Sequence, residues 1–205
     1  IMLQQTQVAT VAPYYARFLA AFPDVSALAA APVDRVLELW SGLGYYRRAH
    51  HLHAAAEVIV RLYDCRFPRD ARTIATLPGI GRSTAAAIAA FAFGERGAIL
   101  DGNVKRVLAR VFHVEEAPDT SAGARKLWAL ALDCTPRARV AEYTQAIMDL
   151  GATICTRTNP ACTSCPLAFG CGALATGRVG EIPVARRRAP RRTGRRRPRA
   201  GRRRS

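Results

Sequence analysis

Four cysteines that fall within seventeen residues constrain this chain more than any other feature, because four thiols so close in sequence can converge on one centre. They are Cys155, Cys162, Cys165 and Cys171, spaced C-x6-C-x2-C-x5-C. Structural zinc usually uses two short cysteine knuckles separated by a longer stretch, and two disulfides are disfavoured in a chain with no export signal. A cubane iron–sulfur cluster takes four cysteine donors on a compact loop. The spacing therefore favours a cluster, with zinc and disulfides as the alternatives that stay open.

The remainder of the chain predicts an all-α fold of short helices. Glycine and proline interrupt segments whose apolar residues recur with a helical period, and convincing strand alternation is absent. Pro13 is expected to kink or split the first helix. The expected helices lie at about 2–21, 25–31, 33–41, 46–62, 70–76, 82–93, 102–112, 121–133 and 138–151. Aspartates stand where N-terminal caps are expected, at Asp24, Asp34, Asp70 and Asp101.

The net charge of +16 is concentrated at one end of the chain. Residues 178–205 hold thirteen arginines and one acid, a net +12, which leaves only +4 for residues 1–177. Charge alone therefore does not establish nucleic-acid binding by the folded part. Residues 173–205 are expected to form a disordered, Arg-rich tail, which either adds sequence-independent phosphate contacts or is an accident of where the reading frame ends.

No apolar segment is long enough to span a membrane. The longest run, residues 85–93, falls well short of the roughly 20 residues that a membrane helix needs. Because no signal peptide heads the chain, a cytosolic location without membrane contact is expected. The two isolated cysteines, Cys65 and Cys134, are expected to be small buried hydrophobes.

The segment LPGIGR, residues 77–82, predicts a tight hairpin between two helices. Pro78 ends the first helix, while Gly79 and Gly81 allow backbone angles and close approaches that a side chain would prevent. The free N–H groups at the start of the second helix are suited to bind a phosphate oxygen. An ordinary interhelical turn is the alternative, but the run matches the helix-hairpin-helix motif, which binds the DNA backbone without reading sequence.

The hairpin, an aspartate-headed helix and the cysteine loop, in this order, resemble the endonuclease III superfamily of DNA glycosylases. Within it, the segments MLQQTQV, GLGYY, LPGIGRSTAAAI, ILDGNVKRVLAR, MDLGATICTR and CPL resemble the MutY-type adenine DNA glycosylases, and the similarity runs from residue 1 to about 172. The resemblance implies a helix-hairpin-helix glycosylase fold with two helical subdomains. These are a helical-barrel domain over 1–97, with the helix-hairpin-helix at about 70–93, and a domain over 98–172 that carries a [4Fe-4S] cluster on the four cysteines.

The resemblance also implies a function in base excision repair. A monomeric, monofunctional enzyme, nucleoid-associated in a bacterial cytoplasm, would hydrolyse the N-glycosidic bond of adenine paired with 8-oxoguanine or guanine in double-stranded DNA. The adenine is flipped out of the duplex, and a fixed carboxylate stabilises the positive charge that builds on the sugar. Asp101 matches that carboxylate, whereas its simplest role would be to cap the helix.

Further positions match residues of the family that contact DNA or substrate. Gln4 and Gln5 match a polar wedge beside the flipped base, Tyr45 an aromatic that inserts near the opposite lesion, and Gly79 and Gly81 the phosphate-binding hairpin. Asn103 and Lys105 are suited to orient Asp101 and to contact phosphate, and Gln145 to recognise adenine. The alternative for the glutamines is an exposed polar position on a helix, and for Tyr45 it is core packing.

Ser83 discriminates within the superfamily. Bifunctional members that act on oxidised pyrimidines carry a lysine there, whose amine forms a Schiff base that a serine hydroxyl cannot form. Ser83 therefore favours water as the nucleophile. A bifunctional glycosylase/lyase and a non-catalytic DNA-binding iron–sulfur module remain the alternatives.

Two parts of the family pattern lie outside the sequence. The general acid of the family is a glutamate directly before the residue that matches Ile1, and a Nudix-like domain that recognises 8-oxoguanine usually follows the cluster. We therefore expect this sequence to bind DNA without releasing the base, and to discriminate lesions weakly.

Overall fold

The computed structural model describes residues 1–185 and confirms the all-α prediction, since within these residues the chain forms helices and no strand. The α-helices are α1 (Val8–Ala21), α2 (Val25–Ala30), α3 (Val33–Trp40), α4 (Arg47–Tyr63), α5 (Ala71–Ile74), α6 (Arg82–Phe93), α7 (Gly102–Val111), α8 (Ser121–Cys134), α9 (Val140–Asp149) and α10 (Gly172–Ala175). A π-helical turn (Leu150–Ile154) and two 3-10 turns (Cys162–Ser164 and Ala168–Gly170) lie between α9 and α10. None of the described helices has the length and hydropathy to cross a bilayer.

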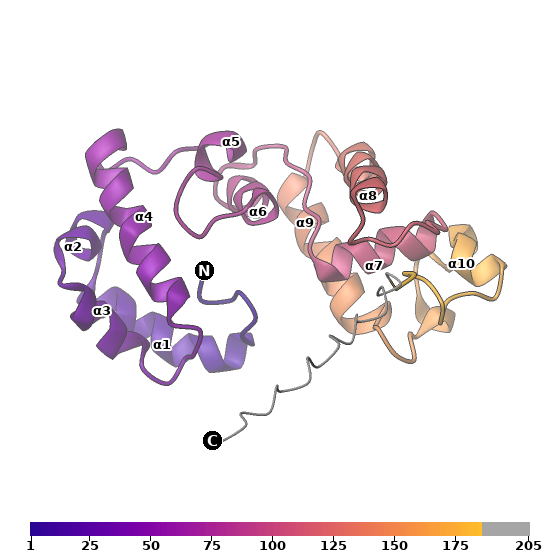
Figure 1. Cartoon of the computed structure of the whole chain (residues 1–205), viewed down its shortest axis with the longest axis horizontal. Helices are drawn as coiled ribbons and strands as arrows, with labels where there is room; N and C mark the ends of the chain where they lie inside the picture. Colours follow the sequence, from indigo (N-terminus) through magenta and orange to yellow (C-terminus); the bar gives the residue numbers. More distant parts are fainter. Residues whose placement is uncertain (186–205) are drawn as a thin grey trace, which may run out of the picture.

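Helices α1 to α4 gather at one end of the molecule and α7 to α10 at the other, with α5 and α6 between them (Figure 1). One group of buried apolar side chains lies among α1 to α4 around Trp40, and a second joins α4 to α5 and α6 around Ile74. The third lies among α6 to α9 around Val107 and Leu127. Alanines on α6 contribute to both the second and the third group, so the hairpin that begins α6 is fixed between the two ends. The division into domains at residue 97 stays a prediction.

The first helix begins later than predicted. Residues 1–7 form turns, and α1 starts at Val8 without a side-chain cap. The carbonyl groups of Met2 and Gln4 accept hydrogen bonds from Arg48 rather than from N–H groups one helical turn further along. The prediction of a helix from residue 2 is wrong because this contact from α4 replaces local helix formation.

Helix α1 runs unbroken through Pro13, so the predicted split does not occur. Proline has no N–H to donate, which leaves the carbonyl group of Ala9 without its helical partner. Both residues are exposed, and water can therefore satisfy that carbonyl.

Three of the four expected aspartate caps are confirmed. Asp24, Asp70 and Asp101 each accept a hydrogen bond from the backbone N–H three residues along, at 2.8, 2.9 and 2.8 Å. Asp34 does not cap a helix, because Pro32 directly precedes α3 and Asp34 already lies in its first turn. There its negative charge interacts favourably with the positive end of the helix dipole but does not cap the helix.

The two isolated cysteines differ. Cys65 is exposed, so its expected burial is wrong. Asp64 and Cys65 both adopt positive φ angles, 47° and 62°, which turn the chain at the surface where α4 ends, and Ser26 Oγ donates to Cys65 Sγ at 3.2 Å. Cys134 is partly buried, and this burial raises the pKa of its thiol.

The chain is ordered beyond the predicted start of the tail at residue 173. Ala173 and Ile182 are 0% and 1% exposed, so that boundary is wrong. The predicted disorder of residues 186–205 lies outside the described residues. The backbone carbonyl of Ile182 accepts a hydrogen bond of 2.8 Å from Nε of the buried Arg110, which ties this segment to α7.

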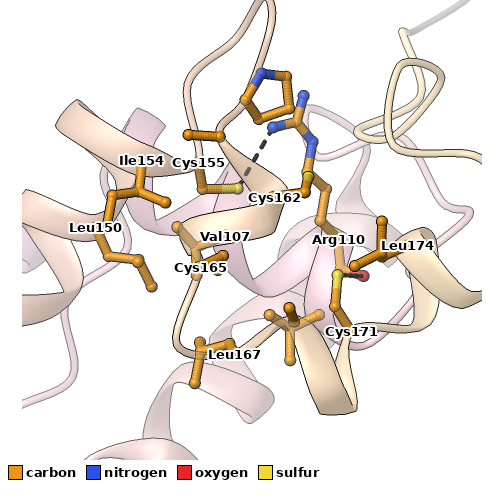
Figure 2. Close-up of a pocket in the computed structure, with 14 residues that line it drawn as sticks. Val107, Arg110, Leu150, Ile154, Cys155, Cys162, Cys165, Leu167, Cys171 and Leu174 are labelled. Carbon is orange, nitrogen blue, oxygen red and sulfur yellow. Dashed lines mark hydrogen bonds between the residues drawn. The ribbon is translucent and has the colours of Figure 1, made fainter.

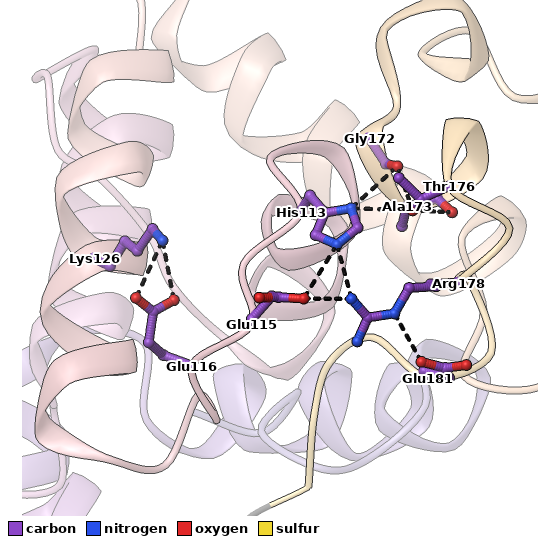
Figure 3. Close-up of polar contacts among 9 residues, drawn as sticks. All are labelled: His113, Glu115, Glu116, Lys126, Gly172, Ala173, Thr176, Arg178 and Glu181. Atoms are coloured by element: carbon purple, nitrogen blue, oxygen red, sulfur yellow. Dashed lines mark hydrogen bonds and ion pairs between the residues drawn. The ribbon is translucent and has the colours of Figure 1, made fainter.

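A second set of polar contacts holds the same segment (Figure 3). Arg178 donates to Glu115 and, at 2.8 Å, to Glu181. His113 places Nε2 at 3.2 Å from Arg178 Nη1 and Nδ1 at 3.2 Å from the carbonyl oxygen of Gly172. The end of α7 and the residues after the cysteine loop are thereby joined.

Well below pH 4.5, we expect the chain and its Glu115→Gln variant to become equally stable. Arg178 holds the pKa of the Glu115 carboxyl below its ordinary value of 4.5. The pair therefore stabilises the fold above that pH, and the contribution is lost as the pH falls through the lowered pKa. The Tm of both proteins, measured across this range, should differ slightly at neutral pH because the pair is exposed. A difference that persists undiminished at the acid end contradicts this assignment.

Candidate functional site

Asp101 is held at the meeting point of α6 and α7. It accepts a hydrogen bond from the backbone N–H of Val104 at 2.8 Å and so caps α7. The residue before it, Leu100, donates its backbone N–H to Ser83 Oγ at 2.9 Å. This bond ties the segment that leads into α7 to the first turn of α6. The carboxylate is thus fixed through both its own helix and the hairpin helix.

The side chains of Asn103 and Lys105 contact residues other than Asp101. Asn103 Oδ1 accepts a hydrogen bond from Arg106 at 2.8 Å, and Lys105 Nζ lies 3.8 Å from an Asp119 carboxylate oxygen. Within residues 1–185, neither side chain makes a hydrogen bond to the Asp101 carboxylate. Their expected role in orienting Asp101 therefore stays a prediction.

Arg106 links the start of α7 to the cysteine loop. Its guanidinium donates to the carbonyl oxygens of Cys155 at 2.7 Å and Gly151 at 2.6 Å, besides Asn103. A Cβ atom on Gly151 would lie 2.6 Å from that of Asn103, so the close approach requires glycine. Sequence reasoning missed Arg106, although the pair Arg106 and Arg110 on one face of the predicted helix was a usable signal.

The four cysteines of the loop line one narrow apolar cavity, together with Val107, Arg110, Leu150, Ile154, Leu167 and Leu174 (Figure 2). Burial, and after it the neighbouring thiols, raises the pKa of Cys162. Arg110 is 2% exposed, and its Nη1 atom lies 3.4 Å from Cys155 Sγ and 2.7 Å from the carbonyl oxygen of Thr156. Thiolates gathered in such a cavity would repel one another unless a cationic centre joined them.

Within the described residues, no group of three or more His, Cys, Asp or Glu side chains is arranged to hold a single metal ion. Four thiolates on one zinc would each lie about 2.3 Å from the metal and therefore close to one another. A cubane cluster spaces its cysteine ligands more widely. The four cysteines that line this cavity are the type and number of donors that a cubane cluster takes.

The hairpin of α6 needs glycine at one of its two positions. Gly79 has a φ of +75°, and a Cβ atom there would lie 2.5 Å from His51 Cβ. Gly81 has an ordinary extended φ of −83°, so the expected demand for special backbone angles does not apply to it. Apart from the two adjoining residues, no atom of residues 1–185 lies within 4 Å of the position of its missing Cβ, and no side chain among these residues caps α6. Within the described residues, the first-turn N–H groups of α6 therefore have no side-chain cap.

Gln4, Gln5 and Tyr45 line a single cavity of about 370 Å³ with Tyr46, Arg47, Arg48 and His51. Tyr45 is 63% exposed, which excludes core packing as its role. Because His51 also packs against Gly79, this cavity lies next to the hairpin. The structure thus brings the expected wedge residues and the expected phosphate site together.

Gln145 is not among the residues that line this cavity. It lies on the exposed face of α9, where its amide donates to Asp149 Oδ1 at 2.8 Å. A residue that sequence reasoning missed is Arg48, which lines the cavity but is only 8% exposed.

The chain is similar to curated proteins and to solved structures. The adenine DNA glycosylase of Buchnera aphidicola (subsp. Baizongia pistaciae) is 41% identical over 182 residues, which are 89% of this chain and 51% of that protein. The human adenine DNA glycosylase is 41% identical over 200 residues, 93% of this chain and 37% of that protein. The chain thus spans about half the length of these relatives, or less.

Among solved structures, a thermostable thymine-DNA glycosylase superposes with a TM-score of 0.78 at 27% identity, covering 85% of this chain and 81% of that one. A non-covalent endonuclease III–DNA complex gives a TM-score of 0.73 at 22% identity, over 86% and 81% of the two chains, and shows the shared fold alone. The profile of HhH-GPD superfamily base excision DNA repair proteins matches residues 1–131. The chain therefore belongs to the HhH-GPD superfamily of base excision DNA repair proteins.

Proposed function

We propose that this chain is the catalytic part of an adenine DNA glycosylase, which removes adenine paired with 8-oxoguanine or guanine from double-stranded DNA. The observation that carries the proposal is the placement of Asp101, fixed at the head of α7 and tied through Leu100 to Ser83 of the hairpin helix. The similarity to curated adenine DNA glycosylases supports the same assignment.

In this proposal the hairpin binds the DNA backbone, and the side chains of the neighbouring cavity contact the bases. The N–H groups at the start of α6, which no described side chain caps, hold a phosphate oxygen near Gly79 and Gly81. Gln4 and Gln5 act as a polar wedge beside the adenine that is flipped from the stack, and Tyr45 inserts near the opposite lesion. Recognition of adenine by Gln145 has the least support, because Asp149 already engages its amide.

Asp101 acts on the charge of the reacting sugar. Cleavage of the bond to adenine gives the sugar oxocarbenium character, and a carboxylate held without further reorganisation stabilises that charge. Water is the nucleophile, since Ser83 offers no amine and its hydroxyl already accepts the backbone N–H of Leu100.

We also propose that Cys155, Cys162, Cys165 and Cys171 hold a [4Fe-4S] cluster. When bound, the cluster joins the four thiolates into one rigid unit. Arg110, buried beside Cys155 and bonded to the carbonyl groups of Thr156 and Ile182, adds positive charge against the thiolates and joins the start of the loop to the segment after α10. Held by these four residues, a cluster would support the loop.

The function is tested with a duplex that contains one adenine opposite 8-oxoguanine and with the matched adenine–thymine duplex. We expect tighter binding of the mispaired duplex, release of free adenine when a glutamate precedes Ile1, and no covalent adduct after borohydride treatment. A borohydride-trapped adduct would instead establish the bifunctional alternative. Equal binding of both duplexes without base release would establish a non-catalytic DNA-binding module.

A further inference from the structure

Arg48 holds the first residues of the sequence by several hydrogen bonds. It projects from the first turn of α4, and its Nη1 atom donates to the carbonyl oxygens of Met2 at 2.7 Å, Ile1 at 3.4 Å and Gln4. Its Nη2 atom donates to Thr6 Oγ1 at 3.1 Å. One side chain thus replaces the helical hydrogen bonds that residues 1–6 do not make.

The same guanidinium holds the loop that carries Tyr45. Nη2 also lies 3.4 Å from the carbonyl oxygen of Leu43 and 3.3 Å from that of Gly44, which in turn accepts the Trp40 indole N–H at 3.0 Å. The guanidinium carbon lies 5.4 Å from the Trp40 ring and 5.3 Å from the Tyr45 ring, within the range of cation–π attraction. Arg48 therefore joins two segments that lie about forty residues apart in sequence.

Two residues that line the cavity have unusual backbone conformations in the segments that Arg48 binds. Gln5 and Tyr45 adopt left-handed conformations with φ angles of 59° and 47°, which residues other than glycine adopt at a cost. Carbonyl groups next to both residues, those of Gln4 and Gly44, are bound by Arg48. The hydrogen bonds offset the strain and determine how both side chains project.

The partners of Arg48 within the described chain are carbonyl oxygens, one hydroxyl and two aromatic rings, and none of them is a carboxylate. Its Nε atom is buried without a hydrogen-bond partner. A buried cation without a counter-ion is costly, so its hydrogen bonds to these oxygens have to compensate for the lost hydration. The arginine at this position is therefore bound to the backbone of both segments, that of residues 1–6 and that of the loop before α4.

We infer that Arg48 is a positioning residue for base extrusion, which sets Gln4, Gln5 and Tyr45 as one rigid probe on the DNA-facing cavity. The inference rests on the proposed function. Lysine cannot substitute for Arg48. Its single ammonium group cannot donate to the carbonyl groups of both segments, which the two terminal nitrogens of the planar guanidinium reach separately.

The test uses the whole chain and a duplex in which fluorescent 2-aminopurine replaces adenine opposite guanine, since extrusion of that base raises its emission. We expect Arg48→Ala and Arg48→Lys to reduce the emission rise at saturating protein about tenfold, the equivalent of one charge-assisted hydrogen bond. Affinity for a fully paired duplex should change by less than about threefold, because the hairpin contacts stay intact. Millimolar methylguanidinium should restore extrusion to Arg48→Ala.

Arg96→Ala is the matched control. Arg96 also donates to two backbone carbonyls, those of Thr135 at 3.0 Å and Leu132 at 2.8 Å, but at the end of α8. The Arg96→Ala variant should have a lower Tm but extrude 2-aminopurine as well as the unmodified chain does. Hydrogen exchange supplies a readout without DNA. The amides of residues 3–6 and 43–46 should exchange faster in Arg48→Ala than in the unmodified chain, and their exchange rates should not change in Arg96→Ala.

The outcomes separate this inference from the proposed function. If the unmodified chain raises no 2-aminopurine emission, the proposed function fails, while the exchange experiment still decides whether Arg48 orders both segments. If the chain extrudes the base and Arg48→Lys does so equally well, Arg48 is not the positioning residue. Exchange that rises over the whole chain would likewise reduce its role to general stability and overturn the inference.

Discussion

Replacing Asp101 with asparagine is expected to lower the rate of adenine release by about a hundredfold to a thousandfold, the usual cost of removing one preorganised electrostatic contact to a transition state. Asparagine has nearly the same shape and caps a helix as well as aspartate does, so the 2.8 Å bond from Val104 should persist. The variant loses only the negative charge that, in the proposed function, stabilises the reacting sugar. The measurement is single-turnover release of adenine by a chain in which a glutamate precedes Ile1.

Asp24→Asn is the control for this experiment, because Asp24 accepts the N–H of Ala27 at the same 2.8 Å at the head of α2. It should leave the rate of adenine release unchanged. Both variants should keep the Tm and the DNA affinity of the unmodified chain. A loss of Tm or DNA binding in Asp101→Asn alone would assign Asp101 a folding role instead of a catalytic one.

The second large effect is expected for Cys165→Ser, which should abolish the content of about four iron atoms per chain. A serine hydroxyl is a poor ligand for iron, and the remaining three thiols would stay in an apolar cavity without a centre to join them. The loop between α9 and α10 should then open, and the Tm should fall. Iron and acid-labile sulfide are measured on protein purified without oxygen.

Cys65→Ser is the matched substitution, since Cys65 is exposed and lies far from the loop in sequence. It should retain the iron and the visible absorption of the unmodified chain. Stoichiometric zinc in place of iron would contradict the cluster assignment, as would full iron content in Cys165→Ser.

Features that depend on neighbouring residues could be predicted from the sequence. The hairpin follows from Pro78 and Gly79, where a positive φ excludes most side chains, and Asp101 caps its helix through a bond to a residue three positions away. The cysteine loop is equally local, because its four thiols lie within one short stretch. Such signals are independent of how distant parts of the chain pack.

The features that sequence reasoning missed depend on long-range contacts of arginines. Arg48 binds residues more than forty positions earlier, and its bonds replace the helix that periodicity predicts at the start of the chain. Arg110 binds Ile182, 72 positions along, which orders a segment whose composition predicts disorder. Periodicity describes which residues are apolar, but it does not reveal which carbonyl groups a distant guanidinium will reach.

The most direct test of the account is whether free adenine is released from a duplex with one adenine opposite 8-oxoguanine, measured by chromatography under single-turnover conditions. With a glutamate before Ile1, we expect release of adenine and an intact DNA strand until alkali is added. The matched adenine–thymine duplex should release none. Strand cleavage without alkali, or release of an oxidised pyrimidine in place of adenine, would contradict the assignment of this chain as a monofunctional adenine glycosylase.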